Sequence, residues 1–132
     1  METLNRYKNM QEIDFKDLDT IANDAAKSFV QNDHVKTNQI RNIFGEIIKM
    51  RTEYDQNKNY MGIRRSMILL KPKLAYAAAR QKSMENFKNF YNKLIDMVET
   101  AGDQNKAVER FFDITEAIVA YHKYYEEKGK NN

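Results

Sequence analysis

The stretch LLKPKLAYAAAR, residues 69–80, decides how the middle of this chain folds. Pro72 interrupts the helical pattern, because proline disfavours helical geometry in the residue before it. Proline is tolerated in the first turn of a helix, so we expect a new helix from Pro72 to Arg80. The alternative is one longer helix that is kinked at Pro72. In such a helix Lys73 and Tyr76 share a face with Arg80.

The row of Lys73, Tyr76 and Arg80 has two interpretations. A cation, an aromatic ring and a second cation on one helix face suggest a surface that meets a polyanion. For such a row taken alone, a solvated face beside a core tyrosine is the more common explanation. In both cases Leu74 and Ala78 fall on the opposite side of the helix and should face the core.

Outside this stretch the apolar residues recur at helical spacing, and no segment alternates as a strand does. With four glycines and one proline in 132 residues, the chain has few places to turn. The fold class that we expect is therefore all-α, a compact antiparallel bundle of about five helices whose central segment is interrupted at Pro72. Thr37 and Ser83 are expected to cap the helices that follow them, and Gly102 to end the helix before it. The expected helices cover residues 15–31, 37–54, 60–80 with the interruption, 84–101 and 104–128.

The bulk composition suits one domain. The chain is 42% hydrophobic and 31% charged and contains no cysteine, which excludes disulfides and thiolate metal sites. No apolar run approaches the ~20 residues of a membrane span, and the polar first residues have no signal-peptide pattern. We expect a cytoplasmic protein with a polar N-terminal arm (residues 1–14), a single helical-bundle domain (15–128) and a loose C-terminal tail (129–132).

The charges are distributed unevenly along the chain. Residues 36–82 contain eleven Lys or Arg and three acids, which gives a net charge of +8. Because the whole chain carries +3, the remainder carries −5. A strongly basic segment within an otherwise acidic chain is the electrostatic pattern of a nucleic-acid-binding protein.

Two further basic clusters lie in this segment. Arg41 and Lys49 share a helix face with Gly45, next to an apolar stripe. Glycine costs about 1 kcal/mol of helix propensity relative to alanine. The close approach of another backbone would explain that cost, and a tolerated surface glycine would explain it equally well. Arg64 and Arg65 form the third cluster, and the shared location of all three clusters in one segment favours a common binding face.

Catalytic chemistry finds little support in the sequence. His34 lies in a polar segment between helices, where we expect an exposed side chain, and His122 continues an apolar stripe, as a hydrogen-bonded core histidine would. Asp113 and Glu116 share a helix face, but no Glu-x-x-His motif accompanies them. No metalloprotease, EF-hand, P-loop or dinucleotide motif occurs. We therefore expect no enzymatic activity, no metal and no cofactor.

Three blocks of the sequence resemble the signature of one family. They are TNQIRNIFGEIIKMR (37–51), LLKPKLAYAAAR (69–80) and FFDITEAIVAYHKYY (111–125), in the family's order and approximate spacing. By these blocks the chain resembles the small α-helical subunit of type III-A CRISPR–Cas effector complexes, the Csm complexes. The second block departs from the pattern at Ala79, where many members have glycine, so no left-handed backbone is required there.

The resemblance implies a non-catalytic subunit that stacks in several copies along a guide RNA and lines the channel where target RNA pairs with the guide. Its partners would be guide RNA, target RNA, the other Csm subunits and copies of itself. By position in the first two blocks, the implied RNA-backbone contacts are Arg41, Lys49, Arg51, Lys71, Lys73 and Arg80. The charge pattern, rather than the resemblance, adds Arg64 and Arg65. The alternative function is a helical protein–protein adaptor whose basic face binds an acidic partner.

The tyrosine-rich end of the third block, YHKYYEEK (121–128), belongs to the acidic remainder of the chain. It suggests the hypothesis that the acidic surface of one copy meets the basic face of the next, which would produce open-ended rows. Acids that only keep the bundle soluble are the simpler alternative.

Overall fold

A computed structural model describes residues 2–130, and these residues form helices and connecting loops without a strand. The predicted all-α fold class is therefore confirmed. The α-helices are α1 (Glu2–Asn5), α2 (Phe15–Gln31), α3 (Thr37–Asn57), α4 (Arg64–Ile68), α5 (Leu70–Arg80), α6 (Glu85–Glu99) and α7 (Gln104–Lys130). Short 3-10 turns cover Met10–Glu12, Tyr60–Gly62 and Lys82–Met84. Within the described part of the chain, no helix has the length and apolar character that crossing a membrane requires.

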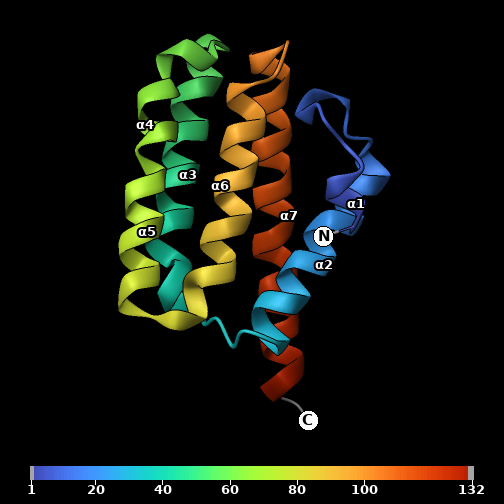
Figure 1. Cartoon of the computed structure of the whole chain (residues 1–132), viewed down its shortest axis with the longest axis vertical. Helices are drawn as coiled ribbons and strands as arrows, with labels where there is room; N and C mark the ends of the chain where they lie inside the picture. Colours follow the sequence, from blue (N-terminus) through green and yellow to red (C-terminus); the bar gives the residue numbers. More distant parts are fainter. Residues whose placement is uncertain (1, 131–132) are drawn as a thin grey trace.

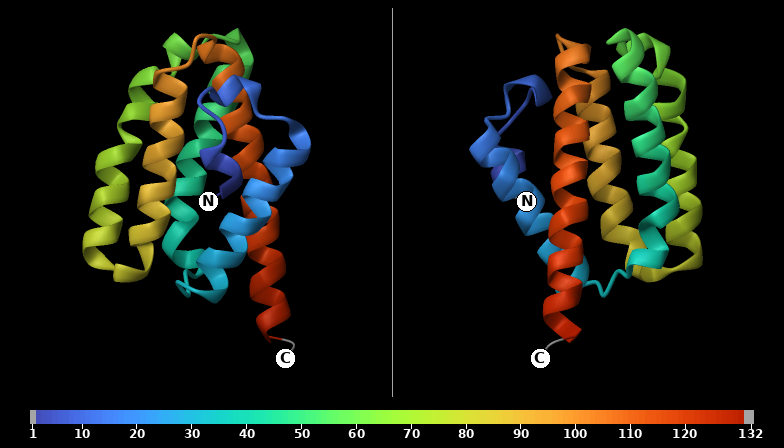
Figure 2. Two further views of the ribbon diagram at one scale, coloured as in Figure 1. Left: turned by 45° about the vertical axis from the view of Figure 1, so that its right-hand side comes forward. Right: turned by 180° about the vertical axis from the view of Figure 1, so that it is seen from behind.

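The long helices run side by side, and the basic segment forms one side of the bundle. In Figure 1, α3 and the end-to-end pair α4 and α5 lie on the left, α6 and α7 lie in the middle, and α2 lies on the right. The view from behind in Figure 2 shows the same order. The most extensive packing joins α2 to α7, whereas α5 packs against α6 and α3. The basic helices therefore lie on the side of the molecule opposite α2.

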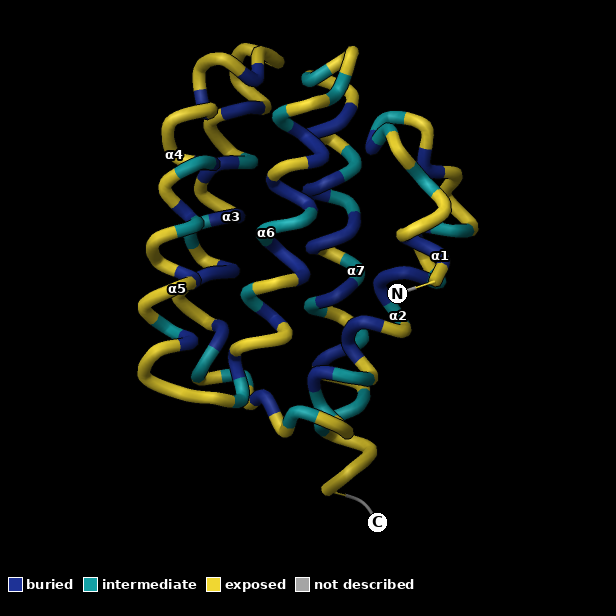
Figure 3. Tube along the Cα trace, viewed as in Figure 1, coloured by how far each residue is buried: buried dark blue, intermediate teal, exposed yellow. Residues whose placement is uncertain are grey.

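The core is built around aromatic side chains from α6 and α7. Figure 3 shows the buried positions of these helices in dark blue. Phe87, Tyr91 and Phe111 are fully buried, with ring centroids 4.8 Å apart for the first two and 5.8 Å apart for the last two. Burying each such side chain stabilises the fold by roughly 1.5–3 kcal/mol. The Tyr91 hydroxyl lies 3.1 Å from Oγ1 of Thr115, so both buried polar groups have a partner. The aromatic stripes are core, as the sequence predicts.

The central segment is interrupted near Pro72, but the break lies at Leu69. Helix α4 ends at Ile68, and Pro72 occupies the third position of α5 rather than the first. In one continuous helix the nitrogen of Pro72 would have to donate a hydrogen bond to the carbonyl of Ile68. Proline has no N–H, so this bond cannot form, and the helix ends at Ile68 and restarts at Leu70.

The first residues of the chain belong to the core. The sequence predicts a polar arm over residues 1–14, yet Leu4, Met10 and Ile13 are at most 1% exposed. The backbone is fixed to α7 as well, because Nε of Arg110 donates a 3.0 Å hydrogen bond to the carbonyl of Ile13. Three apolar residues at irregular spacing give no helical period, which is why the sequence pattern did not reveal this packing.

The predicted helix ends also need correction. Ser83 lies in a 3-10 turn and Met84 is the N-cap of α6, because the buried Met84 side chain fixes this turn against the core. Helix α6 ends at Glu99, before Gly102. At the other end of the chain α7 continues to Lys130, so the expected loose tail starts inside a helix, and residues 131 and 132 lie outside the described residues.

Candidate nucleic-acid interface

The row predicted on α5 is present. Lys73, Tyr76 and Arg80 are exposed on one side of the helix, with 65% of Tyr76 accessible, whereas Leu74 and Ala78 are buried behind them. The guanidinium carbon of Arg80 lies 5.6 Å from the centroid of the Tyr76 ring, a distance at which a cation and an aromatic ring attract each other.

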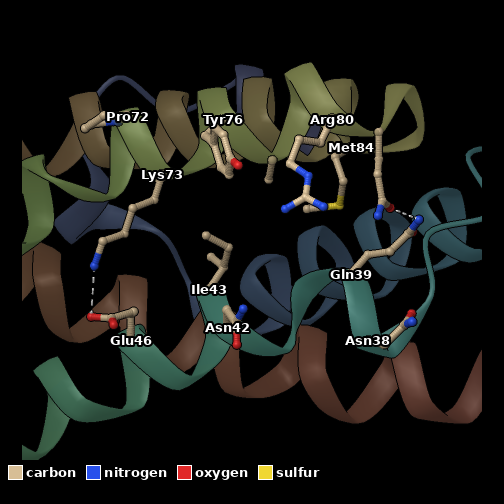
Figure 4. A pocket seen from close by; sticks show the side chains of 12 residues that line it. Asn38, Gln39, Asn42, Ile43, Glu46, Pro72, Lys73, Tyr76, Arg80 and Met84 are labelled. Carbon is tan, nitrogen blue, oxygen red and sulfur yellow. Dashed lines mark hydrogen bonds and ion pairs between the residues drawn. The ribbon is translucent and has the colours of Figure 1, made fainter.

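This row forms one wall of a groove between α5 and α3, shown in Figure 4. The groove has a volume of about 670 Å³. Two polar contacts bridge it: Nζ of Lys73 lies 3.3 Å from Oε2 of Glu46, and the amide of Gln39 donates to the amide oxygen of Gln81. Its lining residues are Asn38, Gln39, Asn42, Ile43, Glu46, Pro72, Lys73, Tyr76, Ala77, Arg80, Gln81 and Met84.

Four of the eight predicted contact residues face solvent without an acidic partner. We call them the free cations: Arg41, Lys49, Arg65 and Arg80. None of them forms an ion pair or a side-chain hydrogen bond with any residue from 2 to 130. Arg41, Gly45 and Lys49 follow one another at intervals of four along α3, so these two cations flank an exposed glycine.

The other predicted contact residues are neutralised within the chain. Besides the pair formed by Lys73, three cations of the basic segment meet acids of α6 and α7. Arg51 Nη1 lies 2.6 Å from Oε2 of Glu116, Arg64 Nη2 lies 2.7 Å from Oε1 of Glu99, and Lys71 contacts Asp96. The cations of these three pairs thus face acids of α6 and α7, whereas the free cations have no acidic partner within residues 2–130.

Arg64 is held most firmly of the paired cations. Its Nε donates to Oε1 and Oε2 of Glu99 at 3.0 and 3.2 Å, and the Tyr60 hydroxyl donates to the same carboxylate. Burial by itself would raise the pKa of Glu99, but the hydrogen bonds from Arg64 and Tyr60 outweigh it and hold that pKa below its usual value. The guanidinium of Arg64 therefore has a structural partner that its neighbour Arg65 lacks among the described residues.

The start of α3, which positions the groove and Arg41, is fixed by α7. Lys36 rather than Thr37 is the N-cap, because Thr37 already has helical geometry. The N–H and the hydroxyl of Thr37 donate to Oε1 of Glu126 at 2.8 and 2.7 Å. A carboxylate at a helix N-terminus satisfies its free N–H groups and is favoured by the helix dipole. Glu126 thus performs the role that the sequence assigns to Thr37.

Residues 12–128, most of the chain, match the family model described as Csm2 Type III-A. The chain belongs to the Csm2 family. The resemblance carried by the three sequence blocks is therefore confirmed. As a Csm2 protein the chain is a subunit of a type III-A CRISPR effector, a Csm complex that contains other subunits, and Csm2 is a structural subunit family. Comparisons with curated proteins and with solved structures found no significant match.

The two histidines of this Csm2 chain lie where the sequence predicts. His34 is exposed in the loop between α2 and α3, with a positive φ of 57°. His122 is 2% exposed, and its Nε2 lies 3.0 Å from the carbonyl oxygen of Val35 while its Nδ1 lies 3.3 Å from Oε1 of Glu126. Desolvation lowers the pKa of His122, although Glu126 opposes that shift. Both ring nitrogens are occupied by structural contacts.

The carboxylates that resembled metal ligands in the sequence also have protein partners. Asp113 and Glu116 both face Arg51, at 3.7 and 2.6 Å. Burial raises the pKa of Asp113, and the charge of Arg51 opposes the change. Over residues 2–130 no group of three or more His, Asp or Glu side chains is placed to hold a metal ion.

Sequence reasoning did not find three features of the Csm2 surface: the groove, the carboxylate of Glu46 inside it and the cap from Glu126. Helical periodicity shows which residues share a face of one helix, but it does not show which helix lies opposite. The family's first block contains Glu46 and its second block contains the row on α5, so the only available signal was that both blocks lie in one basic segment.

Proposed function

We propose that this Csm2 chain is a non-catalytic scaffold subunit that binds the RNA backbone with its free cations. The observation that carries the proposal is the sorting of charge described above. Arg51, Arg64 and Lys71 are used to hold α3, α4 and α5 against α6 and α7. The free cations form no ion pair within the described residues, and they lie on helices that form one side of the bundle.

The contact is with phosphates and therefore independent of sequence. A Lys or Arg that neutralises a phosphate releases a counterion whatever the base, and this term dominates binding without sequence preference. In guide-directed recognition base pairing reads the sequence, while the protein holds the duplex through its shape and its phosphates. Guide RNA and target RNA are the RNA partners in this proposal, and copies of the chain stack along them.

The remaining partners are other subunits of the Csm complex. Beside Arg65, the side chains of Met61 and Leu69 are 63% and 42% exposed. Large apolar side chains that are exposed next to one another often mark a surface that binds another protein. Met61 and Leu69 line a shallow depression on α4 together with Arg64, Arg65 and Ile68. This surface supports a protein contact next to the RNA contact, rather than an adaptor that binds protein alone.

We propose no catalytic role for the histidines. The ring of His122 is enclosed, and both of its nitrogens contact protein groups. His34 is exposed in the loop between α2 and α3, and its side chain forms no hydrogen bond or ion pair within residues 2–130 that would orient it for catalysis.

Binding to RNA at increasing salt concentration tests the proposal. The variant Arg41→Ala/Lys49→Ala should bind every RNA sequence more weakly, and the slope of log K against log salt should become shallower by about two, one for each lost phosphate contact. The control is Lys27→Ala/Lys123→Ala, which removes the same charge from exposed positions on α2 and α7. Each variant should change the free energy of unfolding by less than about 0.5 kcal/mol, because these are surface positions.

Two outcomes contradict the proposal. One is RNA binding by the unmodified chain that does not depend on salt. The other is an equal loss of affinity in the two double variants, which would show that net charge alone, and not the side of the bundle formed by α3–α5, determines binding.

A further inference from the structure

The groove between α3 and α5 contains groups that a backbone contact does not require. Phosphate binding uses cations, but the centre of the groove presents the ring of Tyr76 and the side-chain amide of Asn42. Within residues 2–130 neither the Tyr76 hydroxyl nor the Asn42 amide has a hydrogen-bond partner, and neither does the Arg80 guanidinium. All three remain available to a ligand.

The groove is shaped for a flat ring with a polar edge. Its floor is apolar, because Ile43 and Met84 are 5% and 1% exposed and the half-buried Ala77 also lines the groove. The bridges described above, Lys73 to Glu46 and Gln39 to Gln81, are placed toward its two ends in Figure 4. Its volume of about 670 Å³ lies within the range of roughly 300–1,000 Å³ that is usual for small-ligand sites.

We propose that this groove holds one unpaired base of single-stranded RNA. The base stacks on the face of Tyr76 that Arg80 leaves open, as bases stack on aromatic side chains in single-strand binding. The Asn42 amide, which can both donate and accept, hydrogen-bonds the edge of the base. The inference rests on the proposed function, because the free cation Arg80 binds the phosphate that follows the base.

The site distinguishes unpaired from paired nucleotides and discriminates little between bases. Every base has a π-face and an edge with donors or acceptors, so Tyr76 and one amide accept all four. A base within a duplex has both faces stacked and its edge paired, so it does not enter. An acidic peptide is a poorer occupant, because Glu46 already pairs with Lys73 and leaves Arg80 as the only unpaired cation in the groove lining within residues 2–130.

The test compares RNA oligonucleotides of equal length in which a single nucleotide is either normal or abasic. The full chain should bind the normal oligonucleotide about 5-fold or more tightly than the abasic one at low salt, the effect of one stacked base. Tyr76→Ala should remove this difference, and Tyr76→Phe should preserve it because the ring remains. The control is Tyr124→Ala: Tyr124 is 54% exposed on α7 and has Lys128 at 5.8 Å from its ring, but it lies outside the groove.

A Tyr76→Ala variant that keeps the preference for the normal oligonucleotide overturns the base site, and so does an unmodified chain that binds both oligonucleotides equally. Competition by poly-glutamate that is as strong as competition by RNA also overturns it and assigns the groove to an acidic protein. In contrast, absence of salt-dependent binding to either oligonucleotide overturns the proposed function itself. A melting temperature equal to that of the unmodified chain shows that the Tyr76 variants are folded.

Discussion

Two adjacent arginines, Arg64 and Arg65, have the same chemistry and different environments. Arg64 binds Glu99 through two nitrogens, while Arg65 points to solvent beside Met61 and Leu69. Single substitutions at these neighbours can therefore distinguish a stabilising cation from a binding cation, because the two variants have the same net charge.

We expect Arg64→Ala to lower the melting temperature, because it leaves the partly buried Glu99 carboxylate without its cation. We expect Arg65→Ala to leave the melting temperature unchanged and to make the salt slope of RNA binding shallower by about one. Calorimetry and salt-dependent RNA binding on the two single variants measure both effects. Equal melting temperatures for the two variants would show that the Glu99 pair does not stabilise the fold.

A second prediction at this scale concerns His122. Replacing it with Gln should destabilise the chain by about 1–3 kcal/mol, the cost of leaving the buried Val35 carbonyl without its donor if the amide does not reach it. RNA binding at a temperature where the variant is folded should be unchanged. A variant that loses RNA affinity with its stability intact would make His122 part of the binding surface.

The same residue predicts a pH dependence. Desolvation, opposed in part by Glu126, lowers the pKa of His122 in the folded chain below its ordinary value of 6.5. Between that lowered pKa and 6.5 the unfolded chain binds the proton and the folded chain does not, so stability should fall as the pH decreases below about 6.5. The stabilising contribution is fully present above 6.5. His122→Gln should reduce this slope in denaturant titrations across that range, and an unchanged slope would contradict the assignment.

At the level of the helices, Gly45 is the most informative position in α3. A Cβ added there would meet nothing within 4 Å, and the residue has ordinary helical geometry. The fold therefore does not require glycine, although glycine weakens the helix. Its position between Arg41 and Lys49 suggests that the free surface above it has to admit another molecule's backbone.

We expect Gly45→Ala to raise the free energy of unfolding by about 1 kcal/mol. The same change should weaken RNA binding if the RNA backbone approaches the helix between Arg41 and Lys49, because the added methyl group keeps it away. Chemical denaturation and RNA titration measure the two effects, and Ala75→Gly, an exposed change on α5 in the opposite direction, serves as a control. A stabilised Gly45→Ala variant with unchanged RNA affinity would identify this glycine as merely tolerated.

At the level of the whole molecule, the first residues determine how far the core extends. Met10 is fully buried although it lies outside the expected domain. Met10→Ala should destabilise the fold by about 2–5 kcal/mol, as is usual for a truncated core side chain. Lys8→Ala, at an exposed position two residues earlier, should change stability by less than about 0.5 kcal/mol. If the two variants melt at the same temperature, the N-terminal segment does not contribute to the stability of the bundle.

The sequence predicted what depends on neighbours along the chain. The bounds of α2 agree with the expectation because its apolar spacing is regular and Asp14 caps it by accepting a hydrogen bond from the N–H of Lys16. The exposed row on α5 was predicted for the same reason. Contacts between helices were not predictable, since nothing local distinguishes Arg64 from Arg65, or indicates that Glu46 lies opposite Lys73.

The cap on α3 has a consequence for the order in which the protein is made. Thr37 and Glu126 are 89 residues apart, so a ribosome synthesises the whole of α3 long before the carboxylate that secures its first turn. Until α7 emerges, the nascent chain holds the first turn of α3 without this support, and the groove beside it has no fixed wall. The first turn of α3 is therefore completed only when the last helix of the chain has been made.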